Sequence, residues 1–311
     1  MKNAIQTPGV LAVVQLLARQ SSVHSSLHDP MRFTLVHTTS RASKSAEDQL
    51  DSDELGRLVT RLRGEGIDAR SLLIDGPTES GILDAAQQTQ ADLIVLMPQG
   101  RHGLGSLTRS SVTTKLLASA TAPLLIWPER LPETYAQDFL RLPDAVVIVP
   151  LDGGERAERA HPYAVDLANT FERPLVLLRV TPDLTPPLAT FGEEAFVTPE
   201  LLHAVQEEAR HYLTTVRERH AIEFGTPIRS LVLSGPSARR ILDLADAHPG
   251  SVIVMSTDGR GALARATLGS VTRETLHHTS TLIVLIPPHA PPPLISIAPR
   301  QRSAVAVAAQ D

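Results

Sequence analysis

The chain contains two copies of one pattern. At an offset of 159 residues and without gaps, Gly76-Pro77 aligns with Gly235-Pro236 and Ile94-Val95 aligns with Ile253-Val254. The same offset aligns the run Ser-Val-Thr at 111–113 with the same run at 270–272. So many matches at one offset indicate a duplicated domain, and a duplication constrains the architecture more than any single helix or strand. The length of 311 residues allows two domains that each bury a core.

Each copy alternates apolar strands with helices. In the second copy, residues 145–151 and 175–180 are continuous apolar runs, typical of parallel strands that are covered on both faces. Residues 199–219 place apolar side chains three to four positions apart, which predicts a long helix against the sheet. We therefore predict an α/β fold with two tandem, doubly wound, open parallel-sheet domains.

The first copy begins differently from the second. Nothing before Phe33 resembles residues 146–154, the strand and acidic turn that open the second copy. Residues 8–20 fit either a remnant strand or a helix, and we favour the helix.

Four segments follow from this pattern. Residues 1–128 and 144–287 are the predicted domains, and residues 129–143 are a linker in which prolines discourage a long helix. Residues 288–311 are rich in proline and then in alanine. We predict that this tail is disordered or loosely docked.

Composition excludes several classes of protein. The chain has no cysteine, so disulfides, thiolate metal sites and cysteine nucleophiles are excluded. A formal net charge of −5 argues against general attraction to nucleic acid. No apolar run reaches the ~20 residues of a membrane helix, and the amino terminus is a poor secretory signal. We predict a cytoplasmic protein that binds neither nucleic acid nor membrane. Its histidines lack the spacing of a zinc motif, so we predict no protein-bound metal site.

A glycine-bearing loop follows the fourth strand of the second copy. Residues 256–270 lie between that strand and a helix, where open α/β sheets bind their ligands. Backbone amides of a glycine turn and of a helix amino end attract anions. Gly259 can adopt positive φ and so lets a phosphate approach the backbone, and Gly269 can do the same at the entrance to the helix. The hydroxyls of Ser270 and Thr272 would add donors.

Three arginines near this loop are candidates to balance phosphate charge, namely Arg260, Arg265 and Arg273. Each of them fits a solvated surface arginine equally well. The sequence supports a loop that is partly charged, without deciding which side chain faces a ligand.

The loop resembles the signature of the universal stress protein family. That signature is glycine, two residues, glycine, nine residues, and glycine followed by serine or threonine. Here Ser256, Gly259, Gly269 and Ser270 reproduce the spacing, with serine in place of the first glycine. The resemblance covers nearly the whole chain in two copies, as in tandem bacterial members, and implies the Rossmann-like fold of that family.

The resemblance also implies an ATP site in the second copy. By position, Asp152 would contact the nucleoside and the backbone of Val180 the adenine, although Asp152 could instead only form the turn before Gly153-Gly154. Magnesium or manganese would bridge the phosphates. The predicted site residues are Asp152, Val180, Met255 and Ser256 on the nucleoside side, and Gly259, Arg260, Gly269, Ser270, Val271 and Thr272 around the phosphates.

The serine at position 256 departs from the signature. A left-handed backbone at this position would cost a non-glycine residue roughly 1–2 kcal/mol, which would weaken nucleotide binding. With a negative φ, the hydroxyl of Ser256 would instead add a hydrogen bond, and binding would survive.

The first copy keeps little of the signature. Met97, Gly100 and Ser110-Ser111 occupy its positions, and no aspartate matches Asp152. We predict a degenerate copy, and therefore one nucleotide per chain.

The final strands of the two copies are expected to pair with each other. Universal stress proteins pair through their fifth strands, so the resemblance implies that residues 124–128 and 282–287 pair within one chain as a pseudo-dimer. These strands are apolar and need covering. A homodimer of chains is also compatible with the resemblance.

Three functions from different classes fit these features. One is an ATP-binding stress-response regulator that acts on an unknown protein partner. Because the chain lacks GxxxxGK[ST] and an evident catalytic base, such a protein would hydrolyse ATP slowly at most. The second is a scaffold of the same fold that binds no nucleotide, and the third is an ATPase or nucleotidyl transferase that uses the same crevice.

Overall fold

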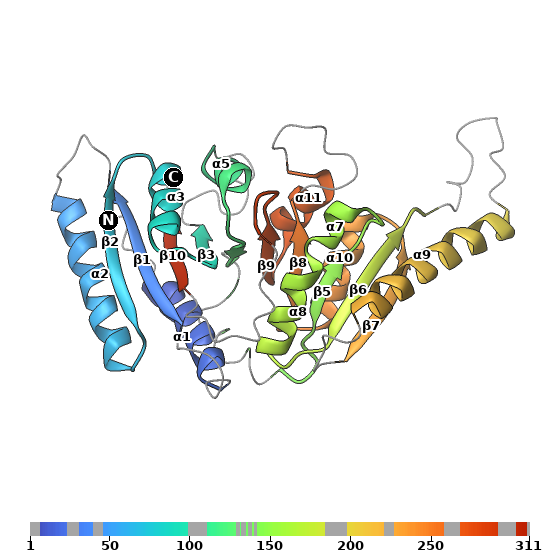
Figure 1. The fold of residues 1–311 in the computed structure, drawn as a ribbon, viewed down its shortest axis with the longest axis horizontal. Helices are drawn as coiled ribbons and strands as arrows, with labels where there is room; N and C mark the ends of the chain where they lie inside the picture. Colours follow the sequence, from blue (N-terminus) through green and yellow to red (C-terminus); the bar gives the residue numbers. More distant parts are fainter. Residues whose placement is uncertain are drawn as a thin grey trace.

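Ten strands form one continuous sheet in the described part of the chain, in the order β2-β1-β10-β3-β4-β9-β8-β5-β6-β7 (Figure 1). The computed structural model describes residues 7–23, 31–39, 46–98, 111–128, 131, 135, 139, 142–183, 198–220, 227–257, 268–291 and 303–309. Among these residues, no helix combines the length and the apolar character that crossing a bilayer requires.

The C-terminal repeat, residues 144–287, has the predicted doubly wound plan. Its strands are β5 (Val147–Pro150), β6 (Leu175–Thr181), β7 (Ile228–Ser234), β8 (Val252–Ser256) and β9 (Leu282–Ile286). They pair in parallel in the order β7-β6-β5-β8-β9. Its helices are α7 (Glu155–Glu158), α8 (His161–Thr170), α9 (Pro199–His220), α10 (Ser237–Ala247) and α11 (Ser270–His278). The segment between β5 and β6 forms two helices, α7 and α8. Pro162 lies at the start of α8, where a missing N–H costs nothing.

The N-terminal repeat, residues 1–128, supplies four strands of its own. These are β1 (Arg32–Thr39), β2 (Ala69–Asp75), β3 (Leu93–Pro98) and β4 (Leu124–Ile126). Its helices are α1 (Thr7–Val23), α2 (Ala46–Gly64), α3 (Thr78–Gln88) and α5 (Ser111–Ser119). The helix expected over residues 8–20 is therefore confirmed as α1. Gly76 and Gly235, which the offset aligns, both have positive φ, at 139° and 131°.

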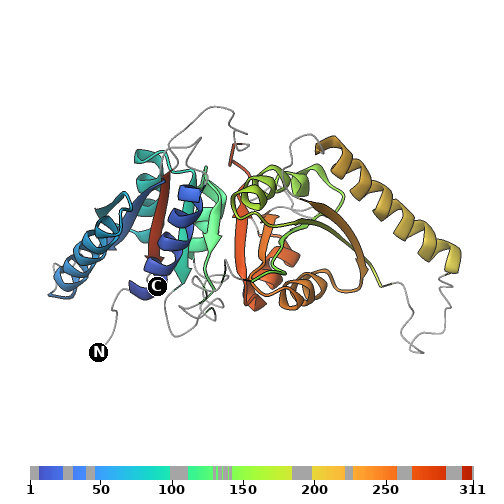
Figure 2. The same cartoon turned by 90° about the horizontal axis from the view of Figure 1, so that it is seen from below.

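The tail corrects the sequence prediction. Residues 303–309 form strand β10 (Ser303–Ala309), which lies between β1 and β3 and pairs in parallel with both. Figure 1 shows this strand in red among the blue and cyan elements of the N-terminal repeat, and Figure 2 shows it beside α1. The tail is ordered here because its alternating alanine and valine side chains fill the position of the missing first strand.

The pairing shows that β10 occupies the same position in the sheet of the N-terminal repeat as β5 occupies in that of the C-terminal repeat. Ala304 pairs with Leu93, just as Val147 pairs with Val252, and Leu93 and Val252 are related by the offset. Both repeats thus have the same strand order, and the first strand of the N-terminal repeat comes from the far end of the chain.

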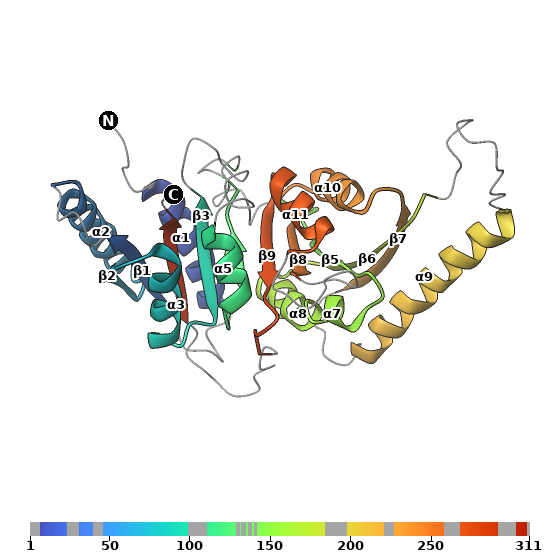
Figure 3. The same cartoon turned by 90° about the horizontal axis from the view of Figure 1, so that it is seen from above.

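Helices cover the sheet on both faces. One face carries α1, α2, α7, α8 and α9, and the other carries α3, α5, α10 and α11. Figure 3 shows this division in the C-terminal repeat, with α10 and α11 on one side of the strands and α7, α8 and α9 on the other. The strand side chains alternate between two buried clusters, as strands that are covered on both faces require.

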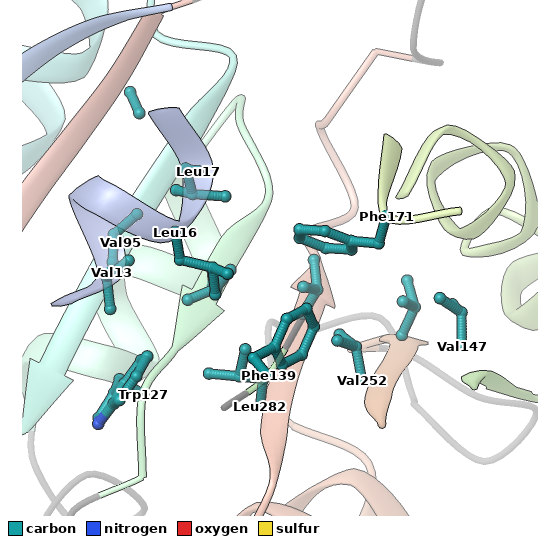
Figure 4. Close-up of a cluster of buried hydrophobic side chains, with 14 of the residues drawn as sticks. Val13, Leu16, Leu17, Val95, Trp127, Phe139, Val147, Phe171, Val252 and Leu282 are labelled. Carbon is teal, nitrogen blue, oxygen red and sulfur yellow. The ribbon is translucent and has the colours of Figure 1, made fainter. Parts of the chain in front are cut away.

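The two repeats are joined through their last strands. β4 pairs antiparallel with β9, with Leu124 opposite Leu285 and Ile126 opposite Ile283. This is the pairing expected between the fifth strands of the two copies. The core continues across the joint, so the repeats share one apolar cluster (Figure 4).

Aromatic side chains from the linker fill the joint. The ring of Phe139 is fully buried, with its centroid 5.1 Å from that of Phe171 and 5.7 Å from that of Tyr135. Trp127 meets Tyr135 edge to face at 5.8 Å. Arg173 donates to the carbonyls of Phe139 and Leu142. Residues of the linker therefore pack as part of the core between the repeats.

Candidate functional site

Three neighbouring strands of the C-terminal repeat end at one edge of the sheet. The order β8-β5-β6 is parallel throughout, so their carboxyl ends lie side by side. Asp152 follows β5, Val180 is the penultimate residue of β6, and Ser256 is the last residue of β8. The topology thus brings together the predicted nucleoside-side residues, at the edge where open α/β sheets bind ligands.

Asp152 forms a tight turn directly after β5. The backbone N–H of Gly154 donates to Oδ1 of Asp152 at 2.8 Å, and Gly153 has a φ of 79° that favours glycine. The turn-forming role considered from the sequence is therefore real. It does not exclude a ligand role, because a carboxylate has two oxygens and about four acceptor positions.

Ser256 continues the strand rather than turning away from it. It pairs with Ile286 in the β8–β9 ladder and is buried. Among the described non-glycine residues, positive φ occurs at Gln90 and Glu172 and not at Ser256. The strain considered for a serine at this position is thus absent. The hydrogen bond from its hydroxyl to a ligand stays a prediction.

The loop after β8 is closed at its base by backbone hydrogen bonds. The N–H of Gly269 donates to the carbonyl of Thr257 at 3.0 Å, and the N–H of Thr257 donates to the carbonyl of Ile286 at 3.1 Å. The two ends of the loop are therefore fixed to the edge of the sheet. The predicted residues Gly259, Arg260 and Arg265 lie outside the described part of the chain.

Gly269 has an extended backbone conformation. It is the N-cap of α11 with φ −56° and ψ 150°, so the positive φ that a glycine can adopt does not occur at this position. An N-cap residue takes extended angles because it leads a strand-like backbone into the helix. Because this N-cap residue is a glycine, it has no side chain that could bond to the first turn of the helix. The start of α11 therefore presents its backbone amides without a cap from Gly269.

The two hydroxyl residues of α11 have different environments. Ser270 is exposed, which is compatible with the predicted contact to a ligand. Thr272 is buried, and its hydroxyl donates to the carbonyl of Ser256 at 3.2 Å. The expected phosphate donor Thr272 is thus corrected to a residue that ties the helix to β8.

Arg273 is an exposed residue whose guanidinium donates to the carbonyl of Leu268 at 3.0 Å. This bond turns the side chain back along the entry to α11. An exposed guanidinium at this position is compatible with both alternatives considered from the sequence for Arg273.

Apolar side chains lie next to this edge of the sheet, on the face that α10 and α11 cover. Val180, Met255 and Val271 all pack in the core cluster on the α10–α11 face of the sheet. Met255 is buried, while Val180 and Val271 are partly exposed. Three predicted site residues from separate segments therefore converge on the same face.

A polar cluster that sequence reasoning missed lies beside the Asp152 turn. Arg179 donates to the carbonyl of Leu151 at 3.2 Å, and its guanidinium carbon lies 5.8 Å from the ring centroid of Tyr212. The hydroxyl of Tyr212 donates to Glu158 at 3.0 Å, and Glu158 also pairs with Arg219 at 2.7 Å. Tyr212 and Arg219 share one face of α9, but nothing in the sequence showed that this face meets α7.

Burial and the charges of this cluster change the pKa of Tyr212. The pKa of Tyr212 is raised above its ordinary value, mainly by burial and then by the negative charge of Glu158, and Asp152 adds a smaller effect in the same direction. Asp152 therefore lies within electrostatic range of this cluster. Arg179 links this cluster to the turn by donating to the carbonyl of Leu151, the residue before Asp152.

Two positions of the N-terminal repeat correspond to Asp152 and Ser256 and carry other residues. Counting along the paired strands, Ala309 of β10 takes the position of Asp152, and Met97 takes that of Ser256. Met97 is buried. The register thus places Ala309 at the position of Asp152, and the degeneracy of the first copy stays a prediction.

Comparisons with known proteins match both repeats. The model of the universal stress protein family matches residues 12–128 and 145–287, and neither range includes β10. A universal stress protein of Methanocaldococcus jannaschii is 29% identical over 144 residues, 45% of this chain and 82% of that protein. One from Mycolicibacterium smegmatis is 25% identical over 255 residues, 81% of this chain and 76% of that protein. The crystal structure of a universal stress protein from Archaeoglobus fulgidus has a TM-score of 0.61 at 16% identity, covering 89% of this chain and 93% of that one.

Proposed function

Because the chain belongs to the universal stress protein family, a family of stress-response proteins, we propose that it is a regulator that holds ATP in its C-terminal repeat. One observation carries the proposal. The carboxyl ends of three parallel strands meet the start of α11, which has a glycine as its N-cap, at one edge, with Asp152 beside them.

The start of α11 fits the phosphates. The first amides of a helix lack partners within the helix, and the positive end of the helix dipole favours an anion. Gly269 adds no side chain that would compete for these amides, and Ser270 is exposed next to them. A divalent cation, magnesium or manganese, would be held chiefly by phosphate oxygens, since no group of three metal-binding side chains occurs in the described part of the chain.

The remaining residues fit the nucleoside. The partly exposed side chains of Val180 and Val271 offer an apolar surface for a flat base, and the Asp152 carboxylate can accept hydrogen bonds from ribose hydroxyls. The N-terminal repeat has Ala309 where this carboxylate would stand, so we propose one nucleotide per chain.

The test is the identity of whatever co-purifies with the full chain. We expect denaturation to release ATP or ADP, detected by mass spectrometry, at close to one molecule per chain. Titration of nucleotide-free protein with ATP and magnesium should reach the same stoichiometry. A chain that carries and binds no nucleotide would instead support the scaffold, and steady-state phosphate release above background would support the ATPase.

Replacing Asp152 separates its two roles. In Asp152→Asn, the amide oxygen can still accept the Gly154 hydrogen bond, so the turn and the thermal stability should be preserved. The lost charge should weaken ATP binding roughly 10-fold, because hydrogen bonds to charged groups are stronger by about 1–1.5 kcal/mol. Isothermal titration calorimetry measures the affinity. The exposed residue Asp53 of α2 gives the control Asp53→Asn, and unchanged affinity in both variants would leave Asp152 with the turn alone.

A further inference from the structure

Arg179 lies near the end of β6, with its side chain on the face of the sheet that α7, α8 and α9 cover. Neighbouring residues of a strand point to opposite faces, and Val180 packs on the α10–α11 face. On the other face, the guanidinium carbon of Arg179 lies 5.8 Å from the ring centroid of Tyr212 on α9. A cation at this distance from an aromatic face is attracted to it. The ring of Tyr212 therefore helps to hold the guanidinium at the carboxyl end of the strands.

The guanidinium of Arg179 binds the residue directly before the Asp152 turn. Its Nη1 donates to the carbonyl oxygen of Leu151 at 3.2 Å, while the N–H of Leu151 donates to the carbonyl of Leu178 at 2.8 Å. A charged donor makes a stronger hydrogen bond than a neutral one. Because a peptide unit is rigid and planar, the bond to the Leu151 oxygen also fixes the direction in which the chain enters Asp152.

Two hydrogen bonds thus fix Asp152. The bond from Arg179 sets the backbone that leads into the turn, and the N–H of Gly154 sets the side chain by donating to Oδ1 at 2.8 Å. Hydrogen bonds between a hydroxyl and a carboxylate have a narrow range of lengths and weaken steeply when they are misaligned. A carboxylate that is to meet the hydroxyls of a sugar therefore needs a fixed position before the sugar arrives.

The N-terminal repeat carries other residues at both positions. His37 of β1 takes the position of Arg179, since the offset of 159 residues relates the residues that these two face on β2 and β7. Ala309 takes the position of Asp152. An imidazole lacks the forked set of donors that a guanidinium presents. The guanidinium and the carboxylate therefore occur together in the repeat to which we assign the nucleotide.

We propose that Arg179 is a positioning residue of the nucleotide site, which fixes the Asp152 turn through the carbonyl of Leu151 so that the carboxylate recognises the ribose hydroxyls. On the proposed binding of ATP by the C-terminal repeat, on which this inference rests, Arg179 makes the site selective for the ribose without touching the nucleotide. A nucleotide without ribose hydroxyls leaves the carboxylate unmatched and binds more weakly.

The test compares ATP with dideoxyATP, which lacks both ribose hydroxyls. Isothermal titration calorimetry with magnesium gives a selectivity ratio, the Kd for dideoxyATP divided by the Kd for ATP. We expect a ratio of about 10 in the parent, because hydrogen bonds to a charged group are lost, and a ratio close to 1 in Arg179→Met. A general loss of stability would weaken both nucleotides alike and leave this ratio unchanged.

Arg179→Lys keeps a cationic donor but loses the fork, so we expect an intermediate ratio. This variant decides the matter if Arg179→Met does not fold, and a parental ratio in it would then overturn the proposal. In a chain that already carries Asp152→Asn, Arg179→Met should change the ratio no further, because it acts through Asp152.

Arg219→Met is the matched control. Arg219 belongs to the same cluster and pairs with Glu158 of α7 at 2.7 Å, so its loss should leave the ratio at the parental value. The proposal is overturned if Arg179→Met folds and keeps the parental ratio, if Arg219→Met lowers the ratio equally, or if the parent binds both nucleotides equally well. A parent that binds no ATP would refute the proposed function itself, and the role of Arg179 with it.

Discussion

Truncation of the chain after Arg302 is expected to unfold the N-terminal repeat and to leave the C-terminal repeat native. The deletion removes β10, whose backbone pairs with both β1 and β3. Burial of one valine side chain contributes about 1.5–3 kcal/mol, so the loss of Val305 and Val307 alone is worth roughly 3–6 kcal/mol. A whole domain has a free energy of unfolding of only about 5–15 kcal/mol.

Hydrogen exchange followed by mass spectrometry measures this effect repeat by repeat. We expect amide protection to be lost in β1, β3 and α3, and to be retained in β5, β6 and β8. Truncation after Ala309 is the matched control, because it removes Gln310 and Asp311 while leaving β10 complete. Retained protection in β1 and β3 after the longer deletion would show that β10 is dispensable.

The variant Gly269→Glu is expected to abolish nucleotide retention without unfolding the protein. The φ of −56° at Gly269 suits any residue, and an acidic side chain at the start of α11 is favourable with the helix dipole. The new carboxylate would bind the amides that we assign to phosphate and would repel the phosphate itself. We expect affinity for ATP to fall about 100-fold or more, corresponding to roughly 3 kcal/mol.

Two measurements test this variant: the nucleotide content after purification, and the affinity for ATP measured by calorimetry. Ser110→Glu is the matched control, since the offset aligns Ser110 with Gly269. Retention should be nearly unchanged in that control, with both variants keeping the unfolding temperature of the parent. Equal losses in the two variants would contradict the assignment of a single site to the C-terminal repeat.

The sequence was informative wherever structure depends on local pattern. The apolar runs at residues 145–151 and 175–180 are strands because continuous apolar segments suit a sheet covered on both faces. The apolar runs that form β4 and β9 were likewise visible, whereas their pairing was anticipated only through the family resemblance. These features need no knowledge of distant contacts.

Strand β10 was missed because its local signals are weak. Alanine is depleted in strands, and four of its seven residues are alanine. Its partner Phe33 lies at the opposite end of the chain, so no hairpin or crossover pattern connects them. The available signal was indirect: the first repeat lacked a strand that the second possessed, and the chain had a short apolar segment left over.

The finer geometry of the site could not be read from residue types. A glycine permits positive φ but does not require it, and the entry to α11 needs extended angles at Gly269. The hydroxyl of Thr272 points to Ser256 because the third position of the helix faces the sheet, which a signature spacing does not reveal. The cluster around Tyr212 depends on how α9 meets α7, and that is a tertiary property.

Because β10 lies after the C-terminal repeat in the sequence, the N-terminal repeat is completed after the C-terminal repeat during translation. The ribosome makes β1 and β3 early, yet the strand between them emerges last, after residues 129–302 have been synthesised. At roughly 5–20 residues per second, the nascent first domain waits about 10–35 s with two open strand edges. The second domain contains all its own strands and can fold before the first. The synthesis of residues 303–309 becomes the step that completes the sheet of the first domain.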